Sequence, residues 1–411
     1  MLLQVRSARP AITLAGKDYY ASLAPYFLNL SYSDNCDGEK ADDLQLQLAD
    51  RDGRFISDWM PDVGEFLDVS IMAERWFAPN AATLSLDCGR FWIDTVDFDL
   101  PQHTVSIKAN SIPTTAHLKT VNETRGWEKS SLRDITEQIA GENKMDGVDW
   151  LAENNPRYAR VEQQEESALQ FLKKRANDAK LAIRVHRNKI VVYDEQKLEE
   201  TAPQFTLTSG MPGVGGIASQ LVGGAAAFLS QGSAGASSYR IATASFTKRV
   251  TDVQKGHKVK HASVKTGDTV TSEFRADVDF HPSGGSGNEA LPDYLNNVSL
   301  STDTEAEDED SGESENGNGG SVRADTEPLP DWQNNTGGTM KAKADTRKSN
   351  KDKETADIQL GIGNPLVAAG MTFNLQGFGQ FDGVWFVDSA EHTVGPEYTT
   401  KLKAHRCLKG Y

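Results

Sequence analysis

The most specific pattern in the chain lies near its C-terminus, where residues 371–404 read MTFNLQGFGQFDGVWFVDSAEHTVGPEYTTKLKA. Apolar and polar residues alternate on both sides of the glycines, at Met371, Phe373 and Leu375 and again at Tyr398, Thr400, Leu402 and Ala404. Alternation with a period of two places one face of a strand on a core and the other outward. This segment therefore predicts antiparallel β-structure.

The glycines of this segment belong to a short motif, Gly377-Phe378-Gly379 followed by Asp382-Gly383. Gly377 and Gly379 would let a strand bend or bulge, and an Asp-Gly pair is a signal for a tight hairpin. We therefore predict that the motif is structural and not catalytic.

Residues 1–112 are predicted to form an N-terminal β-barrel domain. Apolar residues alternate with polar ones in several short runs, for example at Leu67, Val69 and Ile71. Asp52-Gly53 falls between two runs and indicates a turn. Several short strands at this spacing are typical of an antiparallel sandwich or barrel.

Residues 113–200 change to a helical period and are predicted to form a connecting α/β domain. Leu132, Ile135 and Ile139 lie on one face of a helix. A second helix is expected over about 165–180, and alternating residues after it predict two short strands.

Residues 201–411 are predicted to form a second β-domain, in which the last strands of the chain complete a barrel with strands from about 201–280. Two segments interrupt this domain. One is the Gly-rich stretch 209–236, and the other is an insert over about 300–350, whose Asp303–Glu315 run contains eight acidic residues. Carboxylates at this density repel one another, so we expect the insert to be disordered.

The composition limits the classes of partner. The chain has 43 Lys and Arg against 59 Asp and Glu, a formal net charge of −16. This balance argues against stable nucleic-acid binding and against docking on anionic lipid. Cys36, Cys88 and Cys407 show no CxxC spacing, which suits a reducing compartment. Arg6 and Arg9 stand where a signal peptide needs an apolar run, and no membrane anchor is expected.

Signals for chemistry are weak throughout the chain. Residues 213–218 match a GxGxxA pattern, but the next acidic residue is Asp252, which is too distant for a dinucleotide-binding fold. His257 and His261 have the spacing of metal ligands on a helix, but Val259 between them indicates a strand. The sequence therefore predicts no catalytic residue, no metal and no cofactor.

The C-terminal pattern resembles the end of the phage late control protein D family. The resemblance is carried by LGIGNPL at 360–366, by GFGQFDG at 377–383 and by the segment around His392. Trp127 and QEESALQFL at 164–172 resemble the central domain of that family.

This resemblance covers most of residues 1–200 and 355–411, and it departs at 209–236 and 300–320. It implies a fold that is mainly β with a smaller α/β part, with two antiparallel β-barrel domains similar to tail-tube subunits. It also implies a central baseplate hub of a contractile phage tail or phage-tail-like bacteriocin. Three such chains would form a ring that joins a hexameric tube to a trimeric spike.

The partners that the resemblance implies are further copies of the chain, the central spike, the tail tube, the tape-measure protein and baseplate wedge proteins. The protein would reside in the baseplate of a virion or tail-like particle, assembled in the cytoplasm of the host bacterium. Two alternatives remain open at this point. One is a tail-delivered cell-wall hydrolase that uses a pair of carboxylates, and the other is an adhesin-type binding module with an acidic spacer.

Overall fold

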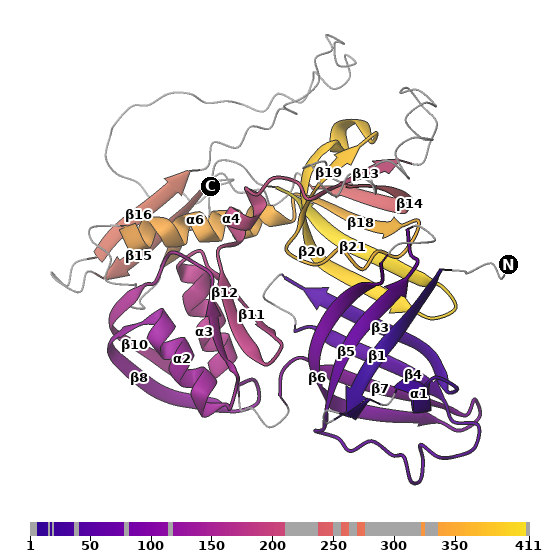
Figure 1. The fold of residues 1–411 in the computed structure, drawn as a ribbon. Coiled ribbons are helices and arrows are strands. Elements are labelled where there is room, and N and C mark those ends of the chain that lie inside the picture. Colours follow the sequence, from indigo (N-terminus) through magenta and orange to yellow (C-terminus); the bar gives the residue numbers. More distant parts are fainter. Residues whose placement is uncertain are drawn as a thin grey trace.

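The computed structural model describes residues 6–14, 17–18, 20–36, 41–77, 82–113, 118–209, 237–249, 256–262, 269–275, 322–324 and 336–407. The described chain has an N-terminal sheet, an α/β part and a C-terminal barrel (Figure 1). Helix α6 and a small sheet lie beside the barrel and the α/β part. The Gly-rich segment beyond Ser209 and the acidic run Asp303–Glu315 lie outside the described residues.

The N-terminal part is a curved antiparallel sheet. Its strands are β1 (Ser7–Leu14), β2 (Lys17–Asp18), β3 (Phe27–Asn35), β4 (Asp43–Ala49), β5 (Phe66–Glu74), β6 (Leu84–Asp99) and β7 (Thr104–Asn110), with the short helix α1 (Tyr20–Leu23) before β3. Leu67, Val69 and Ile71 of β5 are buried, and they pack in one core with residues of β3, β4 and β7. The alternation at Leu67, Val69 and Ile71 thus predicted β5 and its buried face.

The α/β part combines an antiparallel pair of strands, β8 and β10, with a three-stranded sheet and three helices. Its elements are β8 (Asn122–Ser131), α2 (Leu132–Glu142), β9 (Gly147–Trp150), β10 (Arg157–Ser167), α3 (Ala168–Asp178), β11 (Ala182–His186), β12 (Lys189–Tyr193) and α4 (Glu195–Glu199). Ser131 and Ser167 each begin a helix with a capping box, in which the hydroxyl accepts a bond from the third helical amide. Both predicted helices are therefore confirmed, with α3 shorter than 165–180.

The C-terminal part is a six-stranded barrel. Its strands are β13 (Phe205–Ser209), β14 (Ser237–Lys248), β18 (Glu354–Leu360), β19 (Thr372–Gln376), β20 (Gly383–Val394) and β21 (Tyr398–Arg406). The strand order is β19-β13-β14-β18-β21-β20, and pairing of β19 with β20 closes the barrel. The expectation of a purely antiparallel barrel is wrong here, because β13 runs parallel to both β14 and β19.

Strand β20 joins the barrel to the N-terminal sheet. Its first residues pair with β19, and Ser389 to Val394 pair with Asn35 to Leu30 of β3. The strands therefore form one continuous sheet of 13 strands instead of two separate barrels. The prediction of two antiparallel β-barrel domains is therefore confirmed only in part. The C-terminal barrel closes, whereas the N-terminal sheet continues into it because β20 occupies the edge of β3.

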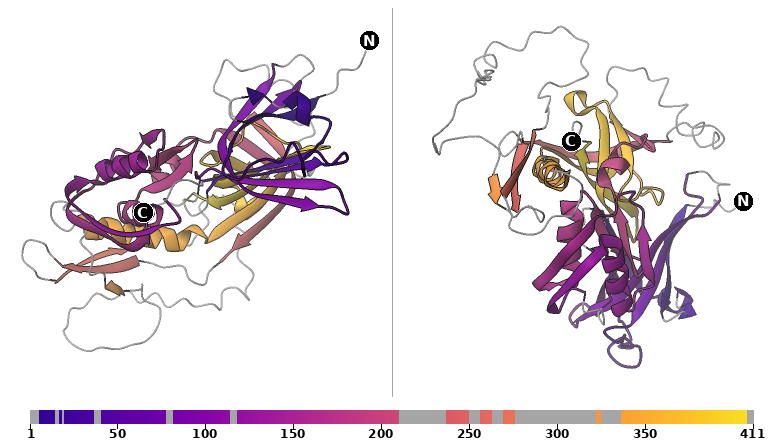
Figure 2. Two further views of the ribbon diagram at one scale, coloured as in Figure 1. Left: turned by 90° about the horizontal axis from the view of Figure 1, so that it is seen from below. Right: turned by 90° about the vertical axis from the view of Figure 1, so that its left-hand side faces the viewer.

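Helix α6 (Thr336–Lys351) corrects the predicted extent of the disordered insert. It lies within the last part of the 300–350 segment, and Ala342, Thr346 and Asn350 on it are fully buried. It packs between α3 and a small sheet (Figure 2) made of β15 (Gly256–Ala262), β16 (Thr269–Arg275) and β17 (Val322–Ala324). Buried positions four residues apart stabilise this helix in spite of its many lysines. Strands from 256–275 thus belong to this sheet and not to the barrel.

Candidate functional site

Two helices and two strands from distant parts of the sequence meet where the barrel contacts the α/β part. Helix α4 carries Glu195 and Glu199, four residues apart, and α6 carries Arg347 and Lys351 with the same spacing. Residues at this spacing lie on one face of a helix. The α4 face is therefore acidic and the α6 face basic, and the two faces are paired.

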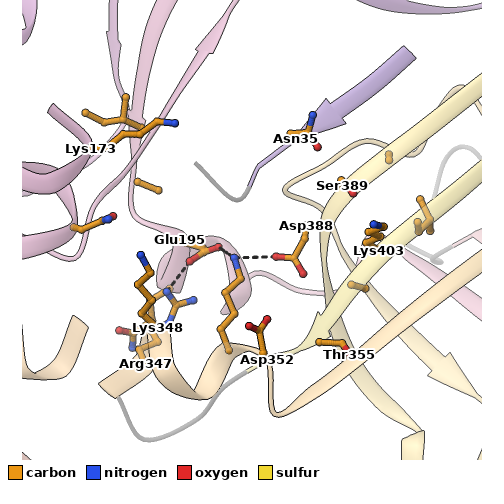
Figure 3. Close-up of a pocket in the computed structure, with 18 of the residues that line it drawn as sticks. Asn35, Lys173, Glu195, Arg347, Lys348, Asp352, Thr355, Asp388, Ser389 and Lys403 are labelled. Carbon is orange, nitrogen blue, oxygen red and sulfur yellow. Dashed lines mark hydrogen bonds and ion pairs between the residues drawn. The ribbon is translucent and has the colours of Figure 1, made fainter. Parts of the chain in front are cut away.

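The paired faces and two strands build a closed ring of ion pairs, in the order Glu195, Arg347, Glu199, His405, Asp388 and Lys351. Glu195 accepts from Arg347 Nη1 at 2.8 Å and from Lys351 Nζ at 2.7 Å. Glu199 accepts from His405 Nε2 at 2.9 Å and from Arg347 Nη2. Asp388 accepts from His405 Nδ1 at 2.8 Å and lies 2.9 Å from Lys351 Nζ. Figure 3 shows the Glu195 and Asp388 side of this charge ring.

The charge ring is balanced only when His405 is an imidazolium. Its imidazole is buried and contacts a carboxylate through each ring nitrogen, so both nitrogens donate. Burial alone would lower the pKa of His405, but the carboxylates of Asp388 and Glu199 outweigh it and raise the pKa to about 9. Burial acts against ionised Asp388 as well, and the adjacent His405 and Lys351 nevertheless lower its pKa.

A β-bulge places Asp388 in the charge ring. The pairing of β20 with β21 shifts register between Val387 and Ser389, and a bulge of this kind re-aims a side chain. The carbonyl of Asp388 accepts from Cys36 N at 2.8 Å, at the end of β3. Asp388 therefore lies at the point where the barrel passes into the N-terminal sheet, and it connects that point to α6.

A second charged cluster ties the N-terminal sheet to the α/β part. Arg184 of β11 donates to Asp34 at 2.8 Å and contacts Asp42 at 3.3 Å. His186 Nδ1 lies 2.9 Å from the same Asp42 carboxylate. Asp34 also accepts from the backbone amide of Ala369, so this cluster reaches the barrel segment before β19. The three parts of the described chain are thus joined by buried charges.

A cleft of about 1100 Å³ lies beside the charge ring, between α3, α6 and strands β18, β20 and β21 (Figure 3). Its lining carries both signs of charge, with Lys173, Lys348 and Lys403 among the cations and Asp352 among the anions. Within the described residues, no group of three His, Cys, Asp or Glu side chains could hold a metal ion. In the same residues no helix is long and apolar enough to cross a membrane.

Glu195 and Asp388, which line this cleft, do not have the charge states of a glycosidase pair. Such a pair keeps one carboxyl protonated in an apolar pocket. Burial works against the ionised form of Glu195, but Lys351 and Arg347 lower its pKa, as His405 does for Asp388. Glu195 and Asp388 are therefore held as anions by cations, which suits a structural joint.

The predicted motif lies at the other end of β20, in the connection that leads from β19. Gly377, Gly379 and Gly383 have φ of 88°, 66° and 133°, a region that favours glycine. The backbone amide of Phe378 donates to Asp382 Oδ1 at 2.6 Å. The connection contains the 3₁₀ turn η2 (Gly379–Phe381), so it is longer than the tight hairpin that Asp382-Gly383 suggested. The motif residues are not part of the charge ring.

Sequence reasoning missed the charge ring. Its six members come from three separated segments, and none stands in a known motif. A usable signal was present in the two helices, where Glu195 and Glu199 match Arg347 and Lys351 in spacing and oppose them in charge. His405 and Asp388 gave no such signal, because each is an isolated polar residue in a β-segment.

No protein-family profile matches the sequence, and no curated protein is significantly similar to it. Solved structures do match. A 43 kDa tail protein of a Shewanella oneidensis prophage superposes with a TM-score of 0.61 at 10% identity, over 98% of this chain and 99% of the other. A tail protein from Neisseria meningitidis superposes with a TM-score of 0.62 at 11% identity, over 97% of both chains.

The chain has the fold of phage and prophage tail proteins. The same tail-protein fold extends to an E. coli component of the type VI secretion system that is itself structurally similar to bacteriophage tail proteins. That match has a TM-score of 0.52 at 10% identity and covers 97% of this chain and 78% of the other. At these identities the likeness concerns the fold, which agrees with the fold of the family that the C-terminal motif resembles.

Proposed function

We propose that this tail-fold protein is a structural baseplate hub of a contractile tail or tail-like particle. In this role three copies form a ring that joins the tail tube to the central spike and leaves a passage for cargo. The observation that carries the proposal is the extent of the match, because nearly the whole chain superposes on nearly the whole length of two tail proteins. A match over a single domain would be much weaker support for the same role.

The architecture supports a ring of this kind. Each chain offers two β-units, the N-terminal sheet and the barrel, and they are coupled rigidly because both pair with β20. Three chains would then present six β-units, which suits a junction between sixfold and threefold symmetry. A closed ring requires heterologous interfaces that return on themselves, and a trimer with two units per chain meets that requirement.

The proposed partners are further copies of the chain, the tail tube, the central spike, the tape-measure protein and baseplate wedge proteins. Support for a spike partner comes from a Francisella PdpA–VgrG complex, which contains a chain of similar fold with a TM-score of 0.51 at 8% identity. This chain covers 53% of that one, so the resemblance concerns about half of the larger protein.

The acidity of the chain fits passage of cargo without retention. Each copy contributes a net charge of −16. If part of this charge faces the channel, it would repel the phosphates of DNA and keep DNA from binding stably. The role is non-enzymatic, and it places the protein in the baseplate of a virion or tail-like particle assembled in the cytoplasm of the host bacterium.

The oligomeric state tests this proposal in solution. The chain is co-expressed with the spike protein of the same particle, and the mass of the purified complex is measured by light scattering. We expect three copies of each protein in one complex. A chain that stays monomeric and fails to bind the spike protein would overturn the hub assignment.

A further inference from the structure

The loop between β4 and β5 presents large apolar side chains to solvent. Four of them are between 37% and 63% exposed, namely Ile56, Trp59, Met60 and Val63. Leu100, in the adjoining β6–β7 turn, is 62% exposed. The amide of Asp50 donates a hydrogen bond to the carbonyl of His103 in that turn, so the loop and the turn are in contact. Both segments lie at the end of the N-terminal sheet that is farthest from the barrel, at the bottom of Figure 1. Large exposed apolar side chains gathered at one place mark interaction sites.

This loop is built to hold its shape. Asp50 Oδ1 accepts from the amide of Phe55, and the amide of Trp59 donates to the carbonyl of Arg54 at 2.9 Å. The rings of Tyr26, Phe55 and Trp59 meet edge to face, with centroids 5.4–5.8 Å apart. Trp59 is therefore anchored at one edge and open at the other. A surface that is already ordered loses little conformational freedom when a partner binds.

The charges around the apolar side chains are mainly acidic. Asp58 and Asp62 are exposed within the loop, and exposed Asp94 follows Ile93, whose backbone bonds to residues 64 and 65. Exposed Asp99 begins the neighbouring turn. Of the basic residues nearby, Arg54 is paired with Asp52 and lies over the Trp59 ring, while Arg51 is exposed. The rim therefore has an excess of negative charge.

The negative charge around the apolar side chains indicates which kind of partner could bind this surface. A second copy that docked through the same patch would bring two acidic rims together, which is unfavourable. An anionic membrane would be repelled for the same reason. A different protein, with apolar side chains inside a ring of Lys or Arg, would complement both the centre and the rim. Trp and Met at the centre of a patch are typical of such protein interfaces.

We propose that residues 51–65 and the 99–103 turn form a docking surface for another protein of the particle, one with an apolar pocket surrounded by basic residues. This inference rests on the proposed hub function and adds to it a surface and the chemistry of the partner. The docking surface lies away from the charge ring and the cleft, so it is a separate site.

Site-specific crosslinking in assembled particles tests the partner. A benzophenone amino acid replaces Met60 in one variant and the exposed Glu137 of α2 in a control variant. We expect the Met60 probe to give one adduct with a different protein of the particle, whose contact peptide is rich in Lys or Arg. An adduct with another copy of this chain, or incorporation into particles without any adduct, would overturn the inference alone. Absence of the chain from particles would overturn the hub proposal and the inference that rests on it.

Substitution at the surface tests its energetic role. The double variant Met60→Ser, Val63→Ser removes apolar surface that is already exposed, so its thermal midpoint should equal that of the unmodified chain. We expect its incorporation into particles to fall at least tenfold. The matched control is Leu151→Ser, because Leu151 is 70% exposed on the α/β part. Equal incorporation of both variants would contradict the inference. Binding of the unmodified chain to neutral phosphatidylcholine vesicles is measured as well. If the chain binds them and the Met60 and Val63 substitutions abolish that binding, the surface binds lipid and the inference is wrong.

Discussion

Two histidines on neighbouring strands of the barrel, His392 on β20 and His405 on β21, are both fully buried but differ in charge, since the first is neutral and the second is a cation. His392 Nδ1 faces the hydroxyls of Tyr398 and Thr400 at 2.8 and 3.2 Å, and Nε2 donates to the carbonyl of Val367. His405 instead lies between two carboxylates. Burial lowers the pKa of His392 to about 4, whereas the carboxylates raise that of His405 to about 9.

The difference shows that neighbours, and not burial, decide what a core histidine does. His392 is a neutral group that uses its hydrogen bonds to hold β20 near the 364–367 segment. His405 is a cation that completes a ring of ion pairs between the barrel, α4 and α6. The first region should respond little to the loss of one hydroxyl, and the second should respond strongly to the loss of one charge.

The largest effect is expected for Arg347→Met. This change leaves Glu195 and Glu199 with one cation fewer in a buried site, and breaking a buried ion pair from one side costs about 3–5 kcal/mol. The free energy of unfolding from denaturant titration is the measurement. Lys348→Met on the exposed side of α6 is the matched control and should change it much less. Equal losses in both variants would show that the ring does not hold α6 in place.

The protonation of His405 predicts a specific pH dependence. Its folded pKa of about 9 lies above the ordinary value of 6.5, so its contribution is complete below pH 6.5 and is lost as the pH rises through 9. A shift of this size corresponds to about 3 kcal/mol. The stability difference between the unmodified chain and His405→Gln should therefore shrink from pH 6.5 to above 9.

His392→Gln is the control for that experiment. His392 is already neutral throughout this range, because its pKa lies near 4. The stability difference caused by His392→Gln should therefore stay constant between pH 7 and 10. If both variants show the same pH dependence, the assignment of a neutral His392 and a cationic His405 is wrong.

A smaller effect is expected for Tyr398→Phe. The change removes one hydroxyl from His392 Nδ1 and leaves that of Thr400 as a donor, so the loss should be about 1 kcal/mol. Unfolding in denaturant measures it. A loss as large as that of Arg347→Met would contradict the view that this region is the less sensitive of the two.

The smallest effect is expected for Arg133→Ala. Arg133 pairs with Glu137 on α2 at 2.8 Å, but both side chains are about half exposed. Exposed pairs at this spacing contribute about 0.3–0.5 kcal/mol and are weakened by salt. The thermal midpoint at low and high salt is the check, and a shift comparable to that of the ring variants would show that burial is not the deciding factor.

Much of the fold could be predicted from periodicity. Alternation marked β5, β19 and β21, and the helical spacing of Leu132, Ile135 and Ile139 marked α2, because local burial patterns are recorded in the order of residues. The parallel pairing of β13 and the shared use of β20 could not be predicted, since pairing between strands far apart depends on the whole topology.

The charge ring could not be predicted for the same reason. Each of its residues is an ordinary surface type in its own segment, and Lys351 in particular belongs to a run of lysines that suggests a solvated stretch. Only the packing of α6 beside α4 and β20 makes them a buried network. The proposed docking surface could not be predicted from the sequence either, because apolar residues such as Trp59 and Met60 are core residues in most contexts.

The hub assignment is tested most directly by a reconstruction of the assembled particle in which the copies of this chain are counted and located. We expect three copies on the particle axis, between the end of the tail tube and the spike, with the 13-stranded sheets lining the ring. Six copies per particle, or a position at the periphery of the baseplate, would contradict it.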